Sequence, residues 1–524
     1  MASVFNKRFW VPALAAFVAF LVFLPSLRSG FVSWDDPMFL LQPTGWRGFG
    51  PAQWAWSFRS TVGALWQPLA YLTYGFDFAL WGLDPRGYHL TSILLHSVCS
   101  ALVALIGLEL FGKEEGEKAA IPALFAALVF AVHPLRVESV SWVTERRDVL
   151  SGAFMLAAIL SHLKGRARTV ALLHALAVLS KGQAVVLPAL LVIMDLWPLR
   201  RKLSFYSAFA EKAPLWIISA LGILITIASL DRSSLPLSQH GIAGRLVQAC
   251  YGLVFYARQT LWPSGLSPLY ELRAPLNPLE ARFIVAVILV IAAVVLIWRE
   301  RARRPWLIAA AAFYGVCLSP VIGLCQNGLQ IVADRYSYVA CLPLALIAGA
   351  ALSAALRRVS RRGPALAAAA LAVAALTAAC VRQQSFWKDS EALWTRMATI
   401  DPFSATARQG LGTLRANQGR IAEAAALYEE ALVLDGACVP AEDELAGLRR
   451  AGAPEGARTK ALAWEIEMRP VCRGTRHNRA VARAQLGDMA YAARELETIV
   501  LTLPDDENAR ADLARAELAR LNRY

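Results

Sequence analysis

Two adjacent carboxylates, Asp35 and Asp36, form the first group of residues in this chain that could do chemistry. They directly follow an apolar run, 9–27, that is long enough to cross a bilayer. Carboxylates are costly to hold in or near lipid, so their position at the exit of this run points to chemistry at the water interface. The alternative is a solvated loop in which the aspartates cap a following helix.

A second group of residues that could do chemistry consists of cations on the side of the membrane where cations are not expected. Arg146, Lys181 and Arg335 stand at ends of apolar runs that we expect on the outer side of the membrane, where Lys and Arg are normally scarce. A cation in such a place needs an anionic partner, for example a lipid phosphate, a diphosphate or a carboxylate. For Arg146 the alternative is an ordinary helix-entry charge that pairs with Glu145 or Asp148.

Glycosyl transfer from a membrane-anchored sugar phosphate is a reaction that would use both groups. A carboxylate can deprotonate an acceptor hydroxyl that attacks the anomeric carbon. Cations can hold the leaving phosphate and stabilise its growing charge. His89 and His96 share one helix face, but no Cys or Glu stands at ligand spacing, so we expect no zinc site.

The composition indicates the kind of element that must position these residues. Hydrophobic residues make up 57% of the 524 residues and charged residues only 18%, against about 25% in soluble proteins, so we expect an integral membrane protein. The net charge of +14 comes largely from short basic clusters between apolar runs, the pattern of cytoplasmic loops. No basic face studded with aromatic residues is evident, so nucleic-acid binding is not expected.

The apolar runs, each of about 15 to 22 residues, predict a polytopic, all-α membrane bundle of about eleven spans. They are 9–27, 89–111, 119–133, 147–163, 168–182, 183–198, 214–231, 281–298, 305–325, 335–356 and 363–382. The first run has no small-residue cleavage site and is expected to be a retained helix. A further run, 245–262, carries polar residues and is expected to lie as an amphipathic helix on the outer interface.

The C-terminal part repeats itself. Pro402, Gly436, Pro470 and Pro504 recur at intervals of 34 residues, the period of tetratricopeptide repeats. Unit 405–438 has small and large residues at the offsets of that repeat, among them Gly412 and Tyr428. Units 439–472 and 473–506 follow it more loosely. The pattern predicts a C-terminal tetratricopeptide-repeat α-solenoid, whose concave surface would dock a protein and not catalyse.

Taken together, short motifs along nearly the whole chain resemble the transmembrane and tetratricopeptide-repeat-containing O-mannosyltransferases and their bacterial relatives, within the GT-C class of glycosyltransferases. The motifs that carry the resemblance are Asp35-Asp36, Gln67-Pro68-Leu69, Gly82-Leu83, Gly87-Tyr88-His89-Leu90, His96, His133-Pro134, Glu138, Arg146, Asp148, Leu179-Ser180-Lys181, Pro188, Asp195, Leu261-Trp262-Pro263, Asp334-Arg335-Tyr336-Ser337-Tyr338, Trp387 and Trp394.

The resemblance implies inversion at the anomeric carbon, a polyprenyl-phosphate sugar donor and chemistry on the outer face. It makes Asp35 or Asp36 the general base or acceptor-orienting carboxylate, and Arg146, Lys181 and Arg335 the donor-phosphate candidates. It adds a set of supporting residues, which are His89, His133, Glu138 and Tyr336.

The chain also departs from the family pattern. Gln67 stands where relatives often have Arg, Arg136 where they often have His, and Gly182 follows Lys181 where Glu is usual. These changes put mannose as the donor sugar in doubt. With only one carboxylate pair evident in the first loop, we expect no divalent metal and no cofactor beyond the lipid-linked donor.

The sequence thus predicts a GT-C-like transmembrane glycosyltransferase domain, 1–384, and a periplasmic tetratricopeptide-repeat domain, 385–524. The enzyme would move a sugar from the lipid-linked donor to a hydroxyl, in a protein or a glycan, and the repeats would bind a protein partner. The Ala- and Arg-rich composition favours a bacterial inner membrane. The alternatives are a polymerase or ligase that acts on lipid-linked oligosaccharide, and a non-catalytic scaffold that presents the repeats.

Overall fold

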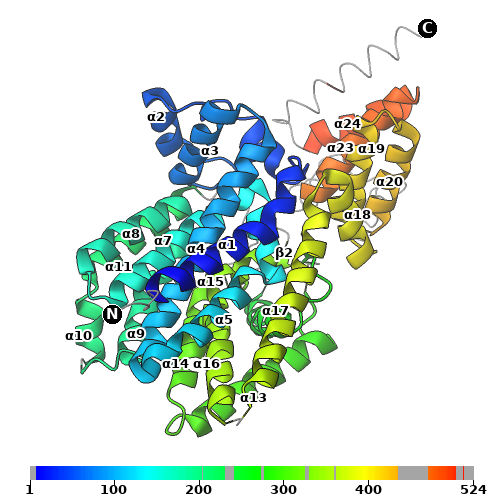
Figure 1. Cartoon of the computed structure of the whole chain (residues 1–524). Coiled ribbons are helices and arrows are strands. Elements are labelled where there is room, and N and C mark those ends of the chain that lie inside the picture. The colour runs from blue at the N-terminus through cyan, green and yellow to red at the C-terminus, as the bar shows by residue number, and fades with distance from the viewer. Residues whose placement is uncertain are drawn as a thin grey trace. The chain divides into compact units, whose positions relative to one another are not determined.

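The structure is a computed structural model and describes residues 7–202, 204–229, 241–272, 276–324, 328, 330–358, 361–434, 470–502 and 512. The chain divides into two compact units, Met1–Asp389 and Ser390–Tyr524. Helices dominate the described part of both (Figure 1). The all-α class expected from the sequence is confirmed.

A helix forms in each of the eleven apolar runs of the first unit, because uninterrupted apolar sequence without water can satisfy its backbone only as helix. These helices are α1 (Lys7–Phe23), α4 (Pro85–Glu115), α5 (Ala120–Ala131), α7 (Arg146–Leu163), α8 (Ala167–Ser180), α9 (Leu187–Leu196), α11 (Ala213–Ser229), α13 (Ala281–Glu300), α14 (Trp306–Leu318), α16 (Leu342–Arg358) and α17 (Gly363–Gln384).

Not all of these helices have the length of a full crossing. Among the described residues, four helical segments are long and apolar enough to cross a membrane, and two bent pairs raise this number to six. The remaining apolar helices are shorter, such as α8 and α14. A multi-pass membrane protein is therefore supported, whereas the number of about eleven crossings stays a prediction.

Shorter elements connect the apolar helices and carry most of the polar residues. They are η1 (Leu24–Arg28), η2 (Pro37–Leu41), α2 (Pro51–Arg59), α3 (Pro68–Trp81), η3 (Gly116–Ala119), η4 (Pro134–Arg136), α6 (Val137–Ser141), η5 (Val143–Glu145), η6 (Gly182–Val186), α10 (Phe205–Ala210), α12 (Ile242–Leu261), β1 (Tyr270–Glu271), β2 (Gln330–Val332), η7 (Asp334–Tyr336), α15 (Ser337–Ala340) and η8 (Ser385–Trp387). Strands β1 and β2 pair antiparallel, with Tyr270 opposite Val332.

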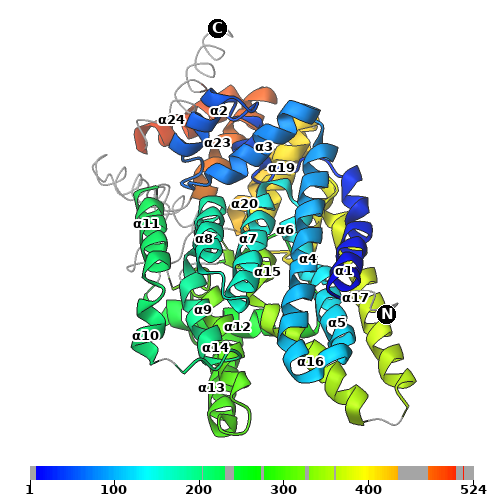
Figure 2. The ribbon, with the colours of Figure 1, turned by 60° about the vertical axis from the view of Figure 1, so that its left-hand side comes forward.

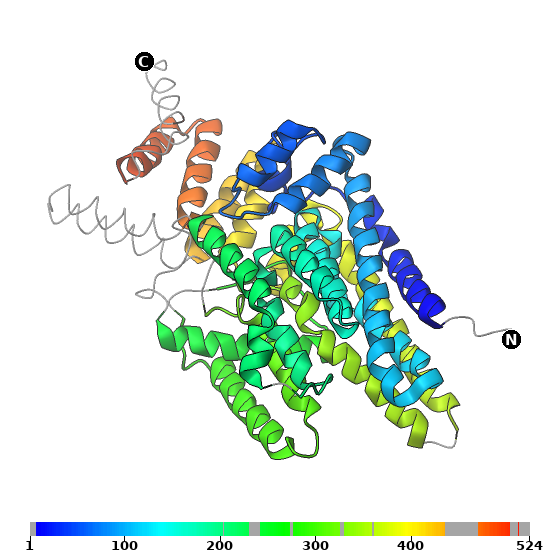
Figure 3. The ribbon, with the colours of Figure 1, turned by 90° about the vertical axis from the view of Figure 1, so that its left-hand side faces the viewer.

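Helix α4 contacts several of the other long helices of the first unit. It packs against α1 and α5 on one side and against α7 on the other. Figure 2 shows α4 between α1 and α7, and Figure 3 shows α1 and α4, in two shades of blue, running side by side. The predicted amphipathic segment is helix α12, and it runs across the direction of α4 in Figure 2.

Two bends create the places where polar residues collect. Helix α5 and the segment Pro134–Ser141 form a pair bent by 55°, and Asp334–Ala340 and α16 form a pair bent by 58°. Pro134 has no N–H to continue the helical ladder of α5, so the chain turns there. The two bends put η4, α6, η7 and α15 in contact with one another.

An aromatic core holds the first loop in place. Trp46, Tyr71, Tyr74 and Tyr88 are buried together with Val143. The Tyr74 hydroxyl lies 3.0 Å from the backbone carbonyl of Val143, to which it donates. This core therefore packs the loop after α1 and helix α3 against the segment just before α7.

The tail forms helical hairpins. Its described helices are α18 (Ser390–Ile400), α19 (Ala405–Asn417), α20 (Ile421–Leu434), α23 (Pro470–Gln485) and α24 (Met489–Thr502). Helix α19 packs on α20, and α23 packs on α24. The degenerate unit 439–472 lies almost wholly outside the described residues. The stack of three repeats therefore stays a prediction.

Candidate functional site

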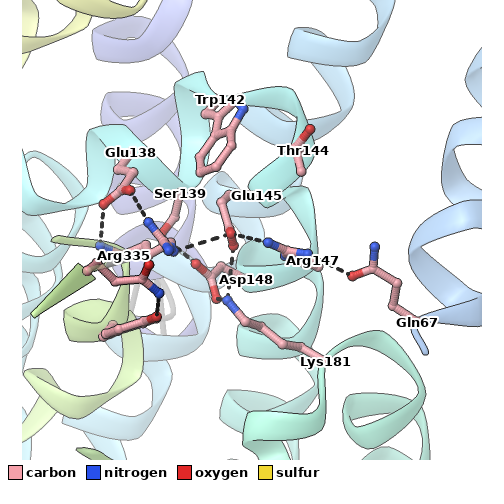
Figure 4. A network of polar contacts seen from close by, with 12 residues as sticks. Gln67, Glu138, Ser139, Trp142, Thr144, Glu145, Arg147, Asp148, Lys181 and Arg335 are labelled. Carbon is pink, nitrogen blue, oxygen red and sulfur yellow. Dashed lines mark hydrogen bonds and ion pairs between the residues drawn. The ribbon is translucent and has the colours of Figure 1, made fainter. Parts of the chain in front are cut away.

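Glu145 is the centre of a cluster of cations in the first unit. Its carboxylate, which is fully buried, accepts from Arg147 Nη2 at 2.5 Å and from Lys181 Nζ at 3.0 Å, and lies 3.3 Å from Arg335 Nε (Figure 4). Burial alone would raise the pKa of Glu145, but the three cations outweigh it and hold that pKa well below its usual range. Glu145 is therefore ionised and holds three cations together.

Two further carboxylates flank the cluster. Glu138 binds Arg335 twice, through Nη1 at 2.5 Å and through the backbone N–H at 2.7 Å. Asp148 accepts from Lys181 Nζ at 2.5 Å. Each of these two cations therefore bridges two carboxylates, which fixes the position of its charged group.

A cavity lies beside Lys181 and Arg335. Its volume of about 20 Å³ admits a group the size of a water molecule. The lining comes from α7, η6 and the residue before it, α14, η7 and α15. It consists of Asp148, Ser151, Gly152, Met155, Lys181, Gln183, Cys317, Arg335, Tyr336, Tyr338 and Val339. Lys181 is 16% exposed and Arg335 11% exposed, so both cations retain surface that faces this space.

Asp36 is a structural carboxylate. It is 1% exposed. One oxygen accepts from Trp142 Nε1 at 3.0 Å, from the Thr144 backbone at 3.2 Å and from Thr144 Oγ1 at 2.5 Å. The other accepts from Val32 N at 2.8 Å. Burial raises the pKa of Asp36 to about 6, although these donors oppose the shift. The side chain forms no cap bond to η2, so the capping alternative does not describe it.

Asp35 has the opposite surroundings. It is half-buried, and its carboxylate forms no hydrogen bond or close ion pair with any residue that the structure describes. Burial raises its pKa, while Arg147 and Arg335 act to lower it. Asp35 is thus a carboxylate with free lone pairs, within electrostatic reach of the cation cluster.

Arg146 does not join the cluster. Its guanidinium is fully buried and pairs with Asp77 at 2.5 Å. It also donates to the Tyr88 carbonyl at 2.7 Å and lies over the Tyr74 ring. Of the three cations that the sequence singled out, the structure brings Lys181 and Arg335 together, and Arg147 takes the third place.

The other residues expected to support the site have varied surroundings. His133 caps η4, where Nδ1 accepts from Leu135 N at 3.2 Å, and its Nε2 lies 3.0 Å from the Thr260 carbonyl. Tyr336 lines the cavity, and its ring lies under the Arg335 guanidinium. His89 is 1% exposed, and neither ring nitrogen has a hydrogen-bond partner among the described residues. Of the four residues expected to support the site, Tyr336 and Glu138 contact Arg335 of the cation cluster.

Sequence reasoning missed the importance of Glu145 and Arg147. Four ionisable residues stand in a row from Glu145 to Asp148, and this run was the available signal. Which of them faces the cluster depends on where η5 ends and α7 begins, and apolar periodicity does not define that junction. In the described part of the chain, no group of three or more His, Cys, Asp or Glu residues is arranged to hold a metal ion.

Comparison with known proteins gives several partial matches. The chain is 38% identical over 98 residues to Protein O-mannosyl-transferase tmtc2 of Xenopus laevis, which is 19% of this chain and 11% of that protein. It is 31% identical over 153 residues to Tmtc1 of Drosophila melanogaster, 28% of this chain and 17% of that protein. It is 31% identical over 172 residues to human TMTC4, 30% of this chain and 23% of that protein. No protein-family profile matches the chain.

Among solved structures, ArnT from Cupriavidus metallidurans, bound to undecaprenyl phosphate, aligns with 97% of this chain and 88% of that chain. The sequence identity is 14% and the TM-score 0.37, a likeness too weak to assign this chain a ligand or an activity. The matched segments cover less than a quarter of each of the three sequence relatives. By sequence, the matched segments of the chain are similar to parts of the TMTC protein O-mannosyl-transferases.

Proposed function

We propose that the chain is a GT-C-like membrane glycosyltransferase. It transfers a sugar, mannose or a similar hexose, from a polyprenyl-phosphate donor to a hydroxyl acceptor, a protein Ser or Thr. The observation that carries this proposal is the free carboxylate of Asp35 within electrostatic reach of a cation cluster that borders a cavity. The protein O-mannosyl-transferases among the relatives support the reaction class.

In this reaction Asp35 accepts the proton of the acceptor hydroxyl as its oxygen attacks the anomeric carbon. The bond from that carbon to the phosphate oxygen breaks, and the lipid phosphate leaves with the electron pair. Lys181 and Arg335 hold this phosphate and stabilise its charge, and Arg147 keeps Glu145 in place between them. Asp36 orients the loop that carries Asp35.

The cations that would bind the phosphate are already paired with carboxylates of the protein. Glu138, Glu145 and Asp148 partly neutralise the cations, so the phosphate binds in exchange for one carboxylate contact and not to a bare charge. Lys181 and Arg335 each contact two carboxylates and can release one of them. The carboxylates thereby limit the affinity for the product phosphate, which has to leave.

The proposal extends to location and partners. We place the site on the outer face of a bacterial inner membrane, at the ends of multi-pass helices. The tail unit, Ser390–Tyr524, would be periplasmic and would hold the acceptor protein or an assembly partner through its helical hairpins. His89, His133, Glu138 and Tyr336 would support the substrate site.

The test measures transfer of labelled sugar from membrane lipid to protein. Membranes carry wild type, Asp35→Asn or Asp36→Asn at equal abundance, and Asp84→Asn serves as control because Asp84 is a partly exposed cap of α4. We expect Asp35→Asn to reduce transfer by about 10²- to 10⁴-fold, the usual contribution of a general base. Asp36→Asn should have a smaller effect, and Asp84→Asn none.

Each other outcome has a clear meaning. Equal transfer by wild type and Asp35→Asn would refute the role of Asp35. Label that accumulates only in glycan would favour a polymerase or ligase. An unchanged phenotype of both site variants, combined with loss of function on deleting 401–524, would favour the non-catalytic scaffold.

A further inference from the structure

Trp142 is the point at which three parts of the candidate site meet. Its indole N–H donates to Asp36 at 3.0 Å. The guanidinium carbon of Arg335 lies 5.7 Å from its ring centroid. Its ring stacks on Trp387, with centroids 5.4 Å apart and an angle of 25° between the planes. Trp142 therefore links the first loop, the cation cluster and the C-terminal end of the membrane unit.

Trp387 belongs to a junction segment, 384–388, that directly precedes the tail unit, which begins at Ser390. Gln384 Nε2 donates to the Val22 carbonyl at 2.9 Å, and Gln384 Oε1 accepts from Ser26 Oγ at 2.9 Å. The Lys388 carbonyl accepts from Gly30 N at 2.9 Å. One end of the junction segment is thus bonded to the end of the first membrane helix, and the other to Gly30, just after that helix.

The same bonds continue toward Trp142. Ser26 Oγ also lies 2.8 Å from Ser141 Oγ, and Ser141 is the residue before Trp142. Ser26 and Gln384 are nearly completely buried, so water does not compete for these hydrogen bonds. The junction segment is therefore connected, through Ser26 and Trp142, to the segments that carry the candidate site, and it is more than a linker to the tail.

We propose that Trp387 is a positioning residue of the active site, acting through Trp142 on both Asp36 and Arg335. This inference rests on the proposed glycosyltransferase function. The Trp387 ring fixes the plane of the Trp142 indole, and that plane decides whether the indole N–H points at Asp36 and whether the ring stays near Arg335. Trp387 Nε1 itself has no hydrogen-bond partner among the described residues, so only its flat ring is required.

The experiment compares Trp387→Ala, Trp387→Phe and Trp387→Leu in the full-length protein, at equal abundance in membranes. Because Phe keeps a flat ring and loses no hydrogen bond, we expect it to retain wild-type transfer within about threefold. The Ala variant should lower kcat by about 10- to 100-fold, the scale of a small misplacement of catalytic groups, with a smaller change in KM for the donor. Leu fills space without a flat ring and should resemble Ala.

A second measurement separates positioning from general stability. Trp387→Ala is combined with Asp36→Asn. If Trp387 acts through the contact of Trp142 with Asp36, the double variant loses much less than the product of the two single losses. Trp216→Ala is the control, because Trp216 is also stacked, on Phe209 at 4.5 Å, and neither of these two residues lines the cavity.

The outcomes are distinguishable. Three results would overturn the inference while the proposed function stands. They are a loss in Trp387→Phe as large as in Trp387→Leu, a wild-type kcat in Trp387→Ala, and fully multiplicative losses in the double variant. If Trp387→Ala does not accumulate, the comparison of Leu with Phe decides. Absence of transfer by wild type and by Trp216→Ala alike would refute the proposed function and the inference with it.

Discussion

Asp35 and Asp36 are neighbours in sequence, yet their surroundings suit them to different tasks. Both carboxylate oxygens of Asp36 accept hydrogen bonds, from the three residues Val32, Trp142 and Thr144. Asp35 has no such bonds among the described residues and lies near Arg147 and Arg335. A base needs a free lone pair at the moment of proton transfer, so Asp35 is the better candidate.

The role of Asp35 predicts a specific pH dependence. Only the ionised carboxylate accepts a proton, so kcat/KM should fall as the pH falls through the pKa of Asp35, which burial raises above its ordinary value. Arg147 lowers this pKa. Arg147→Gln should therefore move the acid limb of the profile to higher pH, while Arg147→Lys, which keeps the charge, should leave it nearly unchanged. The measurement is kcat/KM against pH in membranes of each variant.

A shift of the limb to lower pH in Arg147→Gln would contradict this prediction. So would an equal shift in the Lys variant, because then the hydrogen bond of Arg147 to Gln67 and not its charge would control the profile.

At the scale of elements, the bent pairs explain why the site forms where it does. Pro134 ends the ladder of α5, and the two short helices that follow carry Glu138 and Glu145, with Trp142 between them. The segment Asp334–Ala340 meets them from the other bent pair. Short helices tolerate polar residues because their backbone groups are satisfied by side chains and neighbouring segments.

The sequence predicted the long elements well and the site only in part. Apolar runs specify a helix wherever they are long, so all eleven runs are helical. The partners of single charges depend on the rotation of each helix about its axis. A helix turns by about 100° per residue, so Arg146 and Arg147 point in different directions, one to Asp77 and the other to Glu145. The sequence pattern of a single helix does not show which of its charged side chains faces the cation cluster.

The pair of Arg146 and Asp77 joins α7 to α3 and gives a prediction of its own. Arg146→Met leaves a buried, unpaired carboxylate, which should cost about 3 to 5 kcal/mol of stability. The double variant Arg146→Met/Asp77→Leu removes both charges and should recover much of that loss. Thermal stability and abundance in detergent measure both effects. Donor KM in the double variant should stay close to wild type, whereas a direct phosphate contact of Arg146 would raise it strongly.

Lys181, in contrast to Arg146, is expected to contact the donor phosphate directly. Its Nζ borders the cavity and contacts Glu145 and Asp148. Lys181→Met should raise the donor KM by about 10- to 100-fold, the value of a charged hydrogen bond, measured with saturating acceptor. Lys181→Arg keeps the charge and should lie between Met and wild type. An unchanged donor KM in Lys181→Met would remove Lys181 from the phosphate site.

At the scale of the whole molecule, the chain combines a membrane unit that carries the candidate site with a tail unit of helical hairpins. The tail packs through small residues. A Cβ atom on Gly412 of α19 would lie 2.6 Å from Cε1 of Tyr428 in α20, so the two helices approach closely only because residue 412 has no side chain. The hairpin α19–α20 is therefore sensitive to one added methyl group.

If the tail docks the acceptor, a defect in this hairpin should affect only substrates that need docking. Gly412→Val forces α19 and α20 apart and should cost about 1 to 3 kcal/mol in the tail, measured as faster proteolysis of the tail in intact membranes. KM for a protein acceptor should rise, while kcat for a short Ser/Thr peptide, which needs only the membrane unit, stays near wild type. Ala426→Val is the matched control, because Ala426 is exposed on α20. Equal losses of activity with peptide and protein acceptors would mean that the tail maintains the site itself. Wild-type activity with both acceptors would show that the tail does not bind the acceptor.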